Sequence, residues 1–286
     1  RRMLQGGAVF GRASRPAGVA ALDPAFAETA EVAADRLLER DLVRPASGDG
    51  LAFRHILIRE VAYGTLPRTE RARLHAAAAR WLEDRAIGQE EAYAELIAVH
   101  SREAAALATA LELDDAPAIR ERAVNWLERA SAAAMASAAN MEAAAHLRAA
   151  LELARPDDLD RLHEAIGDTV ETGDVAARAY SEALGLARAA GRPKATILRL
   201  IGKWAEMQLR FLGSIADRAS DEEMDALIAE GAVLLPGVDD EAVRANFLVA
   251  RAFLPFWHLV QGRRSPPDVL TAAEADAREA ITIADR

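Results

Sequence analysis

A pattern of paired helices that repeats after 33 residues constrains this fold more than any other feature of the sequence. Between Leu162 and Leu184, apolar and small residues recur at helical spacing on both sides of Gly173-Asp174. Matching residues stand 33 positions earlier, at Ala134, Asn140, Ala144, Leu147 and Ala150-Leu151. A single pair of helices cannot bury its whole apolar surface, so neighbouring pairs are expected to stack.

The composition favours the same all-α architecture. Hydrophobic residues make up 51% of the 286 residues, which is ample for a core, whereas aromatic residues make up only 5%. Such an alanine-rich chain packs small side chains between closely spaced helices rather than filling a sandwich or a barrel. Gly167, Ala177 and Ala183 would let two antiparallel helices approach closely. We therefore predict an all-α chain.

Residues 1–87 add a small β-hairpin to the helices. Apolar positions recur at helical spacing over residues 28–40, and residues 42–43 begin an extended segment. Residues 46–50 (Ala-Ser-Gly-Asp-Gly) have the composition of a tight turn, and residues 51–53 form the returning strand. An earlier helix is expected to end near residues 8–10, and the helix after the hairpin has Ile56, Val61, Ala62 and Leu66 on its apolar side. The order helix, helix, hairpin, helix is that of a winged-helix domain, which we place at residues 1–87.

A histidine, His55, lies where the hairpin ends and the next helix begins. By itself, a histidine at such a junction is more often a capping or packing residue. Imidazole titrates near neutrality, however, and it readily donates a hydrogen bond to an anion. His55 is therefore also a candidate contact for a phosphate group.

The segment around this histidine, residues 53–62 (Phe-Arg-His-Ile-Leu-Ile-Arg-Glu-Val-Ala), resembles the winged-helix region of bacterial signal-transduction ATPases with numerous domains, the STAND class. Ile56 stands where that family commonly has an aspartate. The resemblance implies that His55 is a nucleotide sensor that donates a hydrogen bond to the β-phosphate of ADP. It also implies that ATP or ADP is held by a preceding ATPase domain, the first expected partner, while this chain is not itself an enzyme. An adenylate cyclase domain can accompany that ATPase domain.

The 33-residue pattern resembles the tetratricopeptide repeat, whose period is close to 34. This resemblance implies that residues 88–286 form a tetratricopeptide-like α-solenoid that binds a protein or small-molecule effector. Later helices of this region are expected at residues 194–213, 220–234, 240–260 and 268–286.

A group of aromatic residues stands out in the second half of this aromatic-poor chain. Their helical spacing favours a place in the core, and the alternative is a lining for an effector site. The group consists of Trp204, Phe211, Phe247, Phe253, Phe256 and Trp257.

The charge distribution bears on two alternative functions. Residues 1–80 carry 13 arginines against 9 acidic residues, a net charge of +4, and the rest of the chain carries −14. One alternative is a transcription factor that inserts the helix at residues 28–40 into DNA. Acidic residues outnumber basic ones in that helix, so nucleic-acid binding is not expected. The other alternative is a scaffold whose repeats hold another protein without any coupling to nucleotide.

Known catalytic patterns are absent from the sequence. It contains no cysteine, no phosphate-binding loop, and neither the H-E-x-x-H nor the G-x-S-x-G motif. A metal site would need a third ligand beside any two histidines that the fold brings together. The histidines are His55, His75, His100, His146, His163 and His258, and the helical patterns around His75 and His100 assign these two to packing.

The sequence also bears on localisation. No apolar run approaches the roughly 18 residues of a membrane-spanning helix, and no signal peptide is recognisable. We therefore expect a cytoplasmic protein with no membrane partner. The opening Arg1-Arg2-Met3 and the unfinished helical pattern at the other end indicate a chain truncated at both ends.

Overall fold

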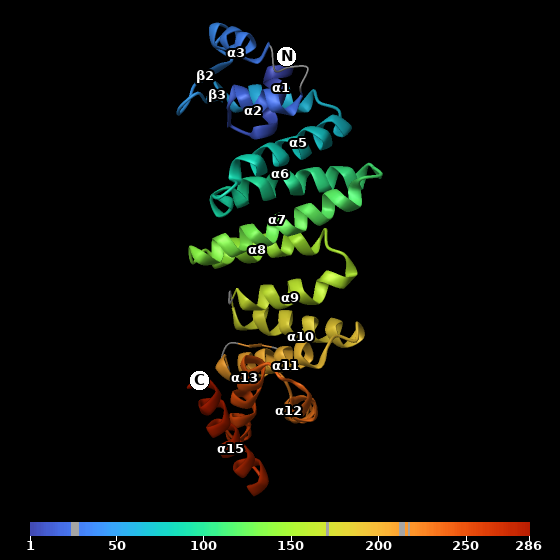
Figure 1. Ribbon diagram of the computed structural model, residues 1–286, viewed down its shortest axis with the longest axis vertical. Helices are drawn as coiled ribbons and strands as arrows, with labels where there is room; N and C mark the ends of the chain where they lie inside the picture. The colour runs from blue at the N-terminus through green and yellow to red at the C-terminus, as the bar shows by residue number, and fades with distance from the viewer. Residues whose placement is uncertain (24–28, 170–171, 212–214, 217) are drawn as a thin grey trace. The chain divides into compact units, whose positions relative to one another are not determined.

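The computed structural model describes residues 1–23, 29–169, 172–211, 215, 216 and 218–286. Within them the chain is mostly helical and has a small antiparallel sheet, in agreement with the predicted all-α class (Figure 1). The chain divides into two compact units, residues 1–154 and 155–286. Residues 1–87 thus share a unit with the helices that follow them, and a separate domain ending at residue 87 stays a prediction.

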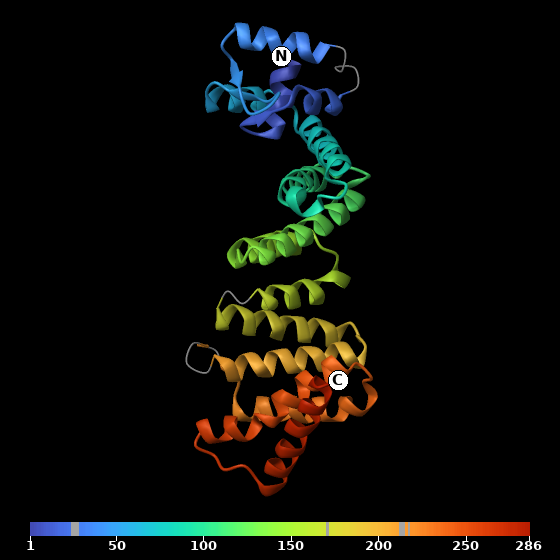
Figure 2. The same cartoon turned by 60° about the vertical axis from the view of Figure 1, so that its left-hand side comes forward.

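The first unit combines short elements around the sheet with longer helices. Its strands are β1 (Ala13–Ser14), β2 (Val43–Pro45) and β3 (Leu51–Phe53). Its helices are α1 (Arg2–Phe10), α2 (Pro16–Leu22), α3 (Ala30–Glu39), α4 (Ile56–Gly64), α5 (Arg68–Ala86), α6 (Glu90–Ala110), α7 (Ala116–Ala136) and α8 (Asn140–Leu151). From α5 to α8, each helix packs against the next (Figures 1 and 2).

The predicted hairpin is present as β2 and β3. Strand β3 lies in the middle of the sheet and pairs antiparallel with β2 on one side and with β1 on the other. Gly48 in the turn has a φ of +65°, a conformation that a glycine adopts without strain. Strand β1 was not predicted, because two residues are too few for an alternating pattern. Helix α3 begins at Ala30, and Glu28 of the predicted helix lies outside the described residues.

Two buried clusters hold these elements around the start of α4. Met3, Leu37 and Leu51 belong to a cluster that joins α1, α3 and the hairpin. Leu22 and Leu74 belong to a second cluster, which packs α2 against α5. The clusters fix the hairpin relative to α1 and α5, and thereby fix where α4 begins.

The second unit consists of helices and two short 3₁₀ turns. Its helices are α9 (Leu159–Asp168), α10 (Gly173–Ala189), α11 (Lys194–Arg210), α12 (Asp221–Leu234), α13 (Glu241–Ala252), α14 (Leu254–Val260) and α15 (Pro267–Ala284). The 3₁₀ turns are η2 (Pro156–Asp158) and η3 (Leu235–Gly237). Helices α9, α10 and α11 lie side by side in both views (Figures 1 and 2).

The helix pair α9 and α10 confirms the predicted close approach and corrects its turn. A Cβ on Gly167 would lie 2.4 Å from the ring of Tyr180, so the absent side chain is what lets the helices meet. Gly173, predicted in the turn, instead begins α10, because the Thr172 hydroxyl accepts a hydrogen bond from the Val175 amide and caps the helix.

Two of the later helices also differ from their predicted ranges. The single helix expected over residues 240–260 is divided into α13 and α14, and Pro255 lies in the first turn of α14. Proline has no amide hydrogen for a helix interior, so a new helix begins there. Helix α11 ends at Arg210, and residues 212–213 of its predicted range lie outside the described part.

Candidate functional site

His55 caps the first turn of α4. Its backbone is extended, with φ −140° and ψ 144°, and its Nδ1 accepts a hydrogen bond from the Leu57 amide at 3.2 Å. A neutral ring that accepts at Nδ1 carries its hydrogen on Nε2. Within the described part of the chain Nε2 has no hydrogen-bond partner, and the residue is exposed. The ring can therefore cap the helix and still donate a hydrogen bond outwards.

Apolar side chains next to His55 are exposed on α4. Ile56 is 43% exposed, Leu57 58% and Val61 68%. The sequence pattern had placed Ile56 and Val61 on the apolar side of this helix together with Ala62 and Leu66, yet only Ala62 and Leu66 are buried. Helical spacing identifies an apolar face, but it cannot tell how much of that face the rest of the chain covers. The uncovered face adjoins the free Nε2 of His55.

A chain of hydrogen bonds inside the first unit begins on the other side of α4. The Tyr63 hydroxyl lies 3.0 Å from Nε2 of His75, and Nδ1 of His75 lies 3.0 Å from Nδ1 of His100. Both imidazoles are 4% exposed. The chain therefore connects α4 through α5 to α6. Both histidines had been assigned to packing from the sequence, and their direct contact was not foreseen.

Burial keeps both of these imidazoles neutral. Burial, together with the nearby His100 and the guanidinium groups of Arg59 and Arg71, lowers the pKa of His75 to about 3. Burial alone lowers the pKa of His100 to about 4. At neutral pH each ring thus carries one hydrogen, and the two facing Nδ1 atoms share a single one.

The six aromatic residues of the second half have two different environments. Phe247 and Trp257 are fully buried and belong to the core. Phe253 and Phe256, by contrast, are 50% and 46% exposed and line a cavity of about 220 Å³. Trp204 and Phe211 are half-buried. The core interpretation is correct for the first two, and the exposed pair is a candidate contact surface.

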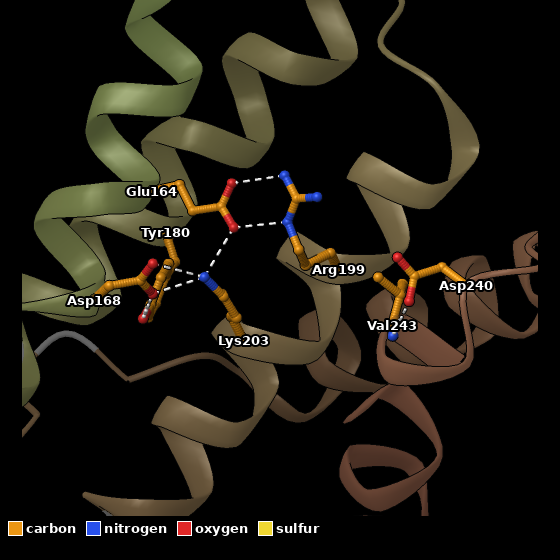
Figure 3. A network of polar contacts seen from close by, with 7 residues as sticks. All are labelled: Glu164, Asp168, Tyr180, Arg199, Lys203, Asp240 and Val243. Carbon is orange, nitrogen blue, oxygen red and sulfur yellow. Dashed lines mark hydrogen bonds and ion pairs between the residues drawn. The ribbon is translucent and has the colours of Figure 1, made fainter. Parts of the chain in front are cut away.

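A network of charged residues joins α9 to α11 in the second unit (Figure 3). Arg199 donates two hydrogen bonds to the Glu164 carboxylate, at 2.8 and 2.9 Å. Lys203 lies between Glu164, at 2.9 Å, and Asp168, at 2.7 Å. Tyr180 from α10 donates to Asp168 at 2.8 Å. All the charges are compensated, so this network is best understood as structural.

The carboxylate of Glu164 is stabilised by its partners more than it is destabilised by burial. Burial by itself raises the pKa of Glu164, but the hydrogen bonds from Arg199 and Lys203 outweigh it and hold the pKa below its ordinary value. Burial raises the pKa of Tyr180, and the neighbouring Asp168 raises it further. The Tyr180 hydroxyl therefore keeps its hydrogen at neutral pH and donates it to Asp168.

Replacing Glu164 by glutamine is expected to lower the free energy of unfolding by about 1 kcal/mol, because Arg199 and Lys203 lose the carboxylate that both of them pair with. The loss is no larger because both cations remain partly solvated. Chemical denaturation followed by circular dichroism measures this loss. Glu230 pairs with Arg188 on the surface, so Glu230→Gln is the matched control and should cost under about 0.5 kcal/mol. Equal losses for the two variants would contradict a special role for the buried carboxylate.

In the part of the chain that the structure describes, neither a metal site nor a membrane-spanning helix is found. Among residues 1–23, 29–169, 172–211, 215–216 and 218–286, no group of three potential ligands could hold a metal ion. In the same part of the chain, no helix is both long and apolar enough to cross a bilayer. Comparison with known proteins leaves the family open, since no protein-family model and no curated protein matches this chain.

Proposed function

We propose that this chain is a non-catalytic regulatory region of a nucleotide-switched signalling ATPase of the STAND class. In this proposal residues 1–87 are a winged-helix domain and residues 88–286 are tetratricopeptide-like repeats. An ATPase domain elsewhere in the intact protein holds ADP, and His55 donates a hydrogen bond to its β-phosphate. An effector bound to the repeats would then favour release of that contact, which is a shift between two pre-existing states.

The environment of His55 is the observation that carries this proposal. Its Nδ1 is occupied by the Leu57 amide, so the neutral tautomer has a hydrogen on an exposed Nε2. A phosphate oxygen is a strong acceptor for such a donor. The neighbouring exposed Leu57 and Val61 offer an apolar surface against which a second domain can pack. A hydrogen-bond donor next to an apolar surface is suited to an interface with a second domain that holds a bound anion.

The exposed aromatic pair supports an effector surface on the repeats. Phe253 and Phe256 lie within one helical turn of each other, with ring centroids 6.5 Å apart, and half of each side chain is accessible. Aromatic side chains of this kind are frequent anchors in protein interfaces. A protein partner or a small molecule could each use this surface.

Direct reading of DNA is a weaker candidate. On α3, the exposed side chains include Glu31, Asp35 and Glu39, and only Arg36 carries a positive charge within the helix. Carboxylates on that face would repel the phosphates of a duplex.

The substitution His55→Asn separates capping from nucleotide sensing. Asparagine is among the best N-cap residues, so α4 and the unfolding transition should be unchanged. Its short side chain cannot extend as far outwards as Nε2, so the ADP retained by the purified intact protein should fall by about tenfold. Nucleotide content is measured by chromatography after denaturation, and His55→Ala serves as the variant that loses both functions.

Two results would count against the proposal. Unchanged ADP content in His55→Asn would remove the sensor role and leave His55 as a helix cap. If the intact gene encodes no phosphate-loop domain, the alternative of a scaffold without coupling to nucleotide is favoured.

A further inference from the structure

A cavity of about 460 Å³ lies in the first unit between the sheet and the helices α5 and α6. Strand β1 and the turn between β2 and β3 form one side of it, and α5 and α6 form the other. This volume is within the range of sites for small organic ligands. The side chains that matter here are Phe10, Arg15, Trp81, Arg85, Tyr93 and His100.

Aromatic rings form much of the wall. Phe10 and Trp81 meet in a T-shaped arrangement with ring centroids 5.4 Å apart and planes at 71°, and Phe10 and His100 meet in the same manner at 5.7 Å. Tyr93 lines the cavity from α6. Fixed aromatic surfaces of this kind favour a flat apolar group over a flexible chain.

The charged side chains at the cavity are cationic. The Arg85 guanidinium lies over the Trp81 ring at 4.4 Å, and Arg15 stands at the opposite side. Asp49 pairs with Arg15 at 3.3 Å but does not line the cavity. Among the described residues that do line it, none is acidic. The electrostatic character therefore favours an anion.

His100 supplies a buried donor or acceptor at the inner end. Its ring is only 4% exposed and its Nδ1 is engaged by His75. No hydrogen bond to Nε2 of His100 is found within residues 1–23, 29–169, 172–211, 215–216 and 218–286. Because His100 lines the cavity, a ligand there can form a hydrogen bond with this atom.

The hydrogen bonds that link His100 through His75 to Tyr63 determine whether Nε2 of His100 is a donor or an acceptor. If the Tyr63 hydroxyl donates to His75, then His75 donates from Nδ1 to His100. Nδ1 of His100 is then an acceptor, so the hydrogen of that ring is on Nε2, on the side of the ring away from His75. In the reverse orientation Nε2 of His100 is an acceptor. An anion in the cavity stabilises the first orientation.

We propose that this cavity binds a small aromatic anion, such as an aromatic carboxylate. The ring of the ligand packs against Trp81 and Phe10, and its carboxylate accepts hydrogen bonds from Nε2–H of His100 and from Arg85. Tyr63 and His75 are positioning residues that hold the His100 tautomer. The site does not depend on the nucleotide switch, although Tyr63 lies on the helix that His55 caps.

Calorimetric titration with 2-naphthoate tests the site, with 2-naphthamide as the uncharged control of the same shape. We expect 2-naphthoate to bind with a dissociation constant of about 1 mM or lower, and the amide to bind about tenfold more weakly. No binding of 2-naphthoate at about ten times that concentration, or equal binding of the amide, overturns the proposal.

Two arginine variants form a matched pair. Arg85→Gln should weaken 2-naphthoate binding about tenfold, since it removes the charge that faces the ligand. Arg129 stacks on Trp126 at 4.7 Å just as Arg85 stacks on Trp81, but it lies outside this cavity. Arg129→Gln should therefore leave the affinity unchanged. If the two substitutions weaken 2-naphthoate binding equally, the ligand either binds elsewhere or binds without specificity. Either result contradicts the proposed site.

The imidazole ¹⁵N spectrum checks the role of His100 without relying on a buried variant. With 2-naphthoate bound, Nε2 of His100 should be protonated and Nδ1 should not. Tyr63→Phe removes the end of the hydrogen-bond chain, so it should weaken binding about threefold and mix the two tautomers. A bound state in which Nε2 lacks the hydrogen excludes the proposed contact.

Discussion

Lowering the pH from 7.5 to 5 is expected to reduce the free energy of unfolding by roughly 4 kcal/mol, about half of it from each of two buried histidines. Burial lowers the pKa of His75 to about 3 and that of His100 to about 4. In the unfolded chain both rings have the ordinary pKa near 6.5. Between pH 6.5 and 4 the unfolded state therefore binds protons that the folded state does not, and stability falls with pH.

Urea denaturation at several pH values measures this loss, and hydrogen exchange of the α5 and α6 amides locates it in the first unit. Carboxylates such as Glu164, whose pKa is also lowered, lose their contribution only at more acidic pH, because the ordinary pKa values of carboxyl groups lie near 4. The double variant His75→Leu/His100→Leu should have a much smaller loss over the same range. If it loses stability in parallel with the original protein, the two histidines are not responsible.

The second large effect is expected for Gly231→Ala in α12, which should lower the free energy of unfolding by about 2 kcal/mol. A Cβ at this position would lie 2.1 Å from the ring of Phe247 on α13. Phe247 is fully buried, so its ring cannot move aside without disturbing the core. The better helix propensity of alanine offsets only about 1 kcal/mol of the cost.

Gly185→Ala is the matched control for this substitution. Gly185 is also helical, but it is exposed and a Cβ there would meet nothing within 4 Å. It should therefore stabilise the protein by about 0.5 to 1 kcal/mol. Phe247→Leu combined with Gly231→Ala should recover part of the loss, since the smaller side chain relieves the contact. Thermal and urea unfolding of these three variants measures the effects, and equal stabilities of Gly231→Ala and Gly185→Ala would contradict the predicted clash.

The local structure around His55 was predicted from the sequence, whereas the role of His55 as a nucleotide sensor stays a prediction. Phe53 and the helix that follows His55 could be recognised from neighbouring residues, because a strand end and a helix start are local features. The contact between His75 and His100 could not, since these residues are 25 positions apart on different helices. The sequence showed only that each histidine stands at a helical position where an apolar residue is expected.

The sequence by itself determined the helical class, the hairpin before His55 and the close approach at Gly167, because each follows from spacing, turn chemistry or side-chain size within a short segment. Tertiary structure alone decided that Val61 stays exposed and that a cavity forms beside Trp81. Exposure and cavities depend on which faces of distant elements meet, and a periodic pattern states only that a face is apolar, not what covers it.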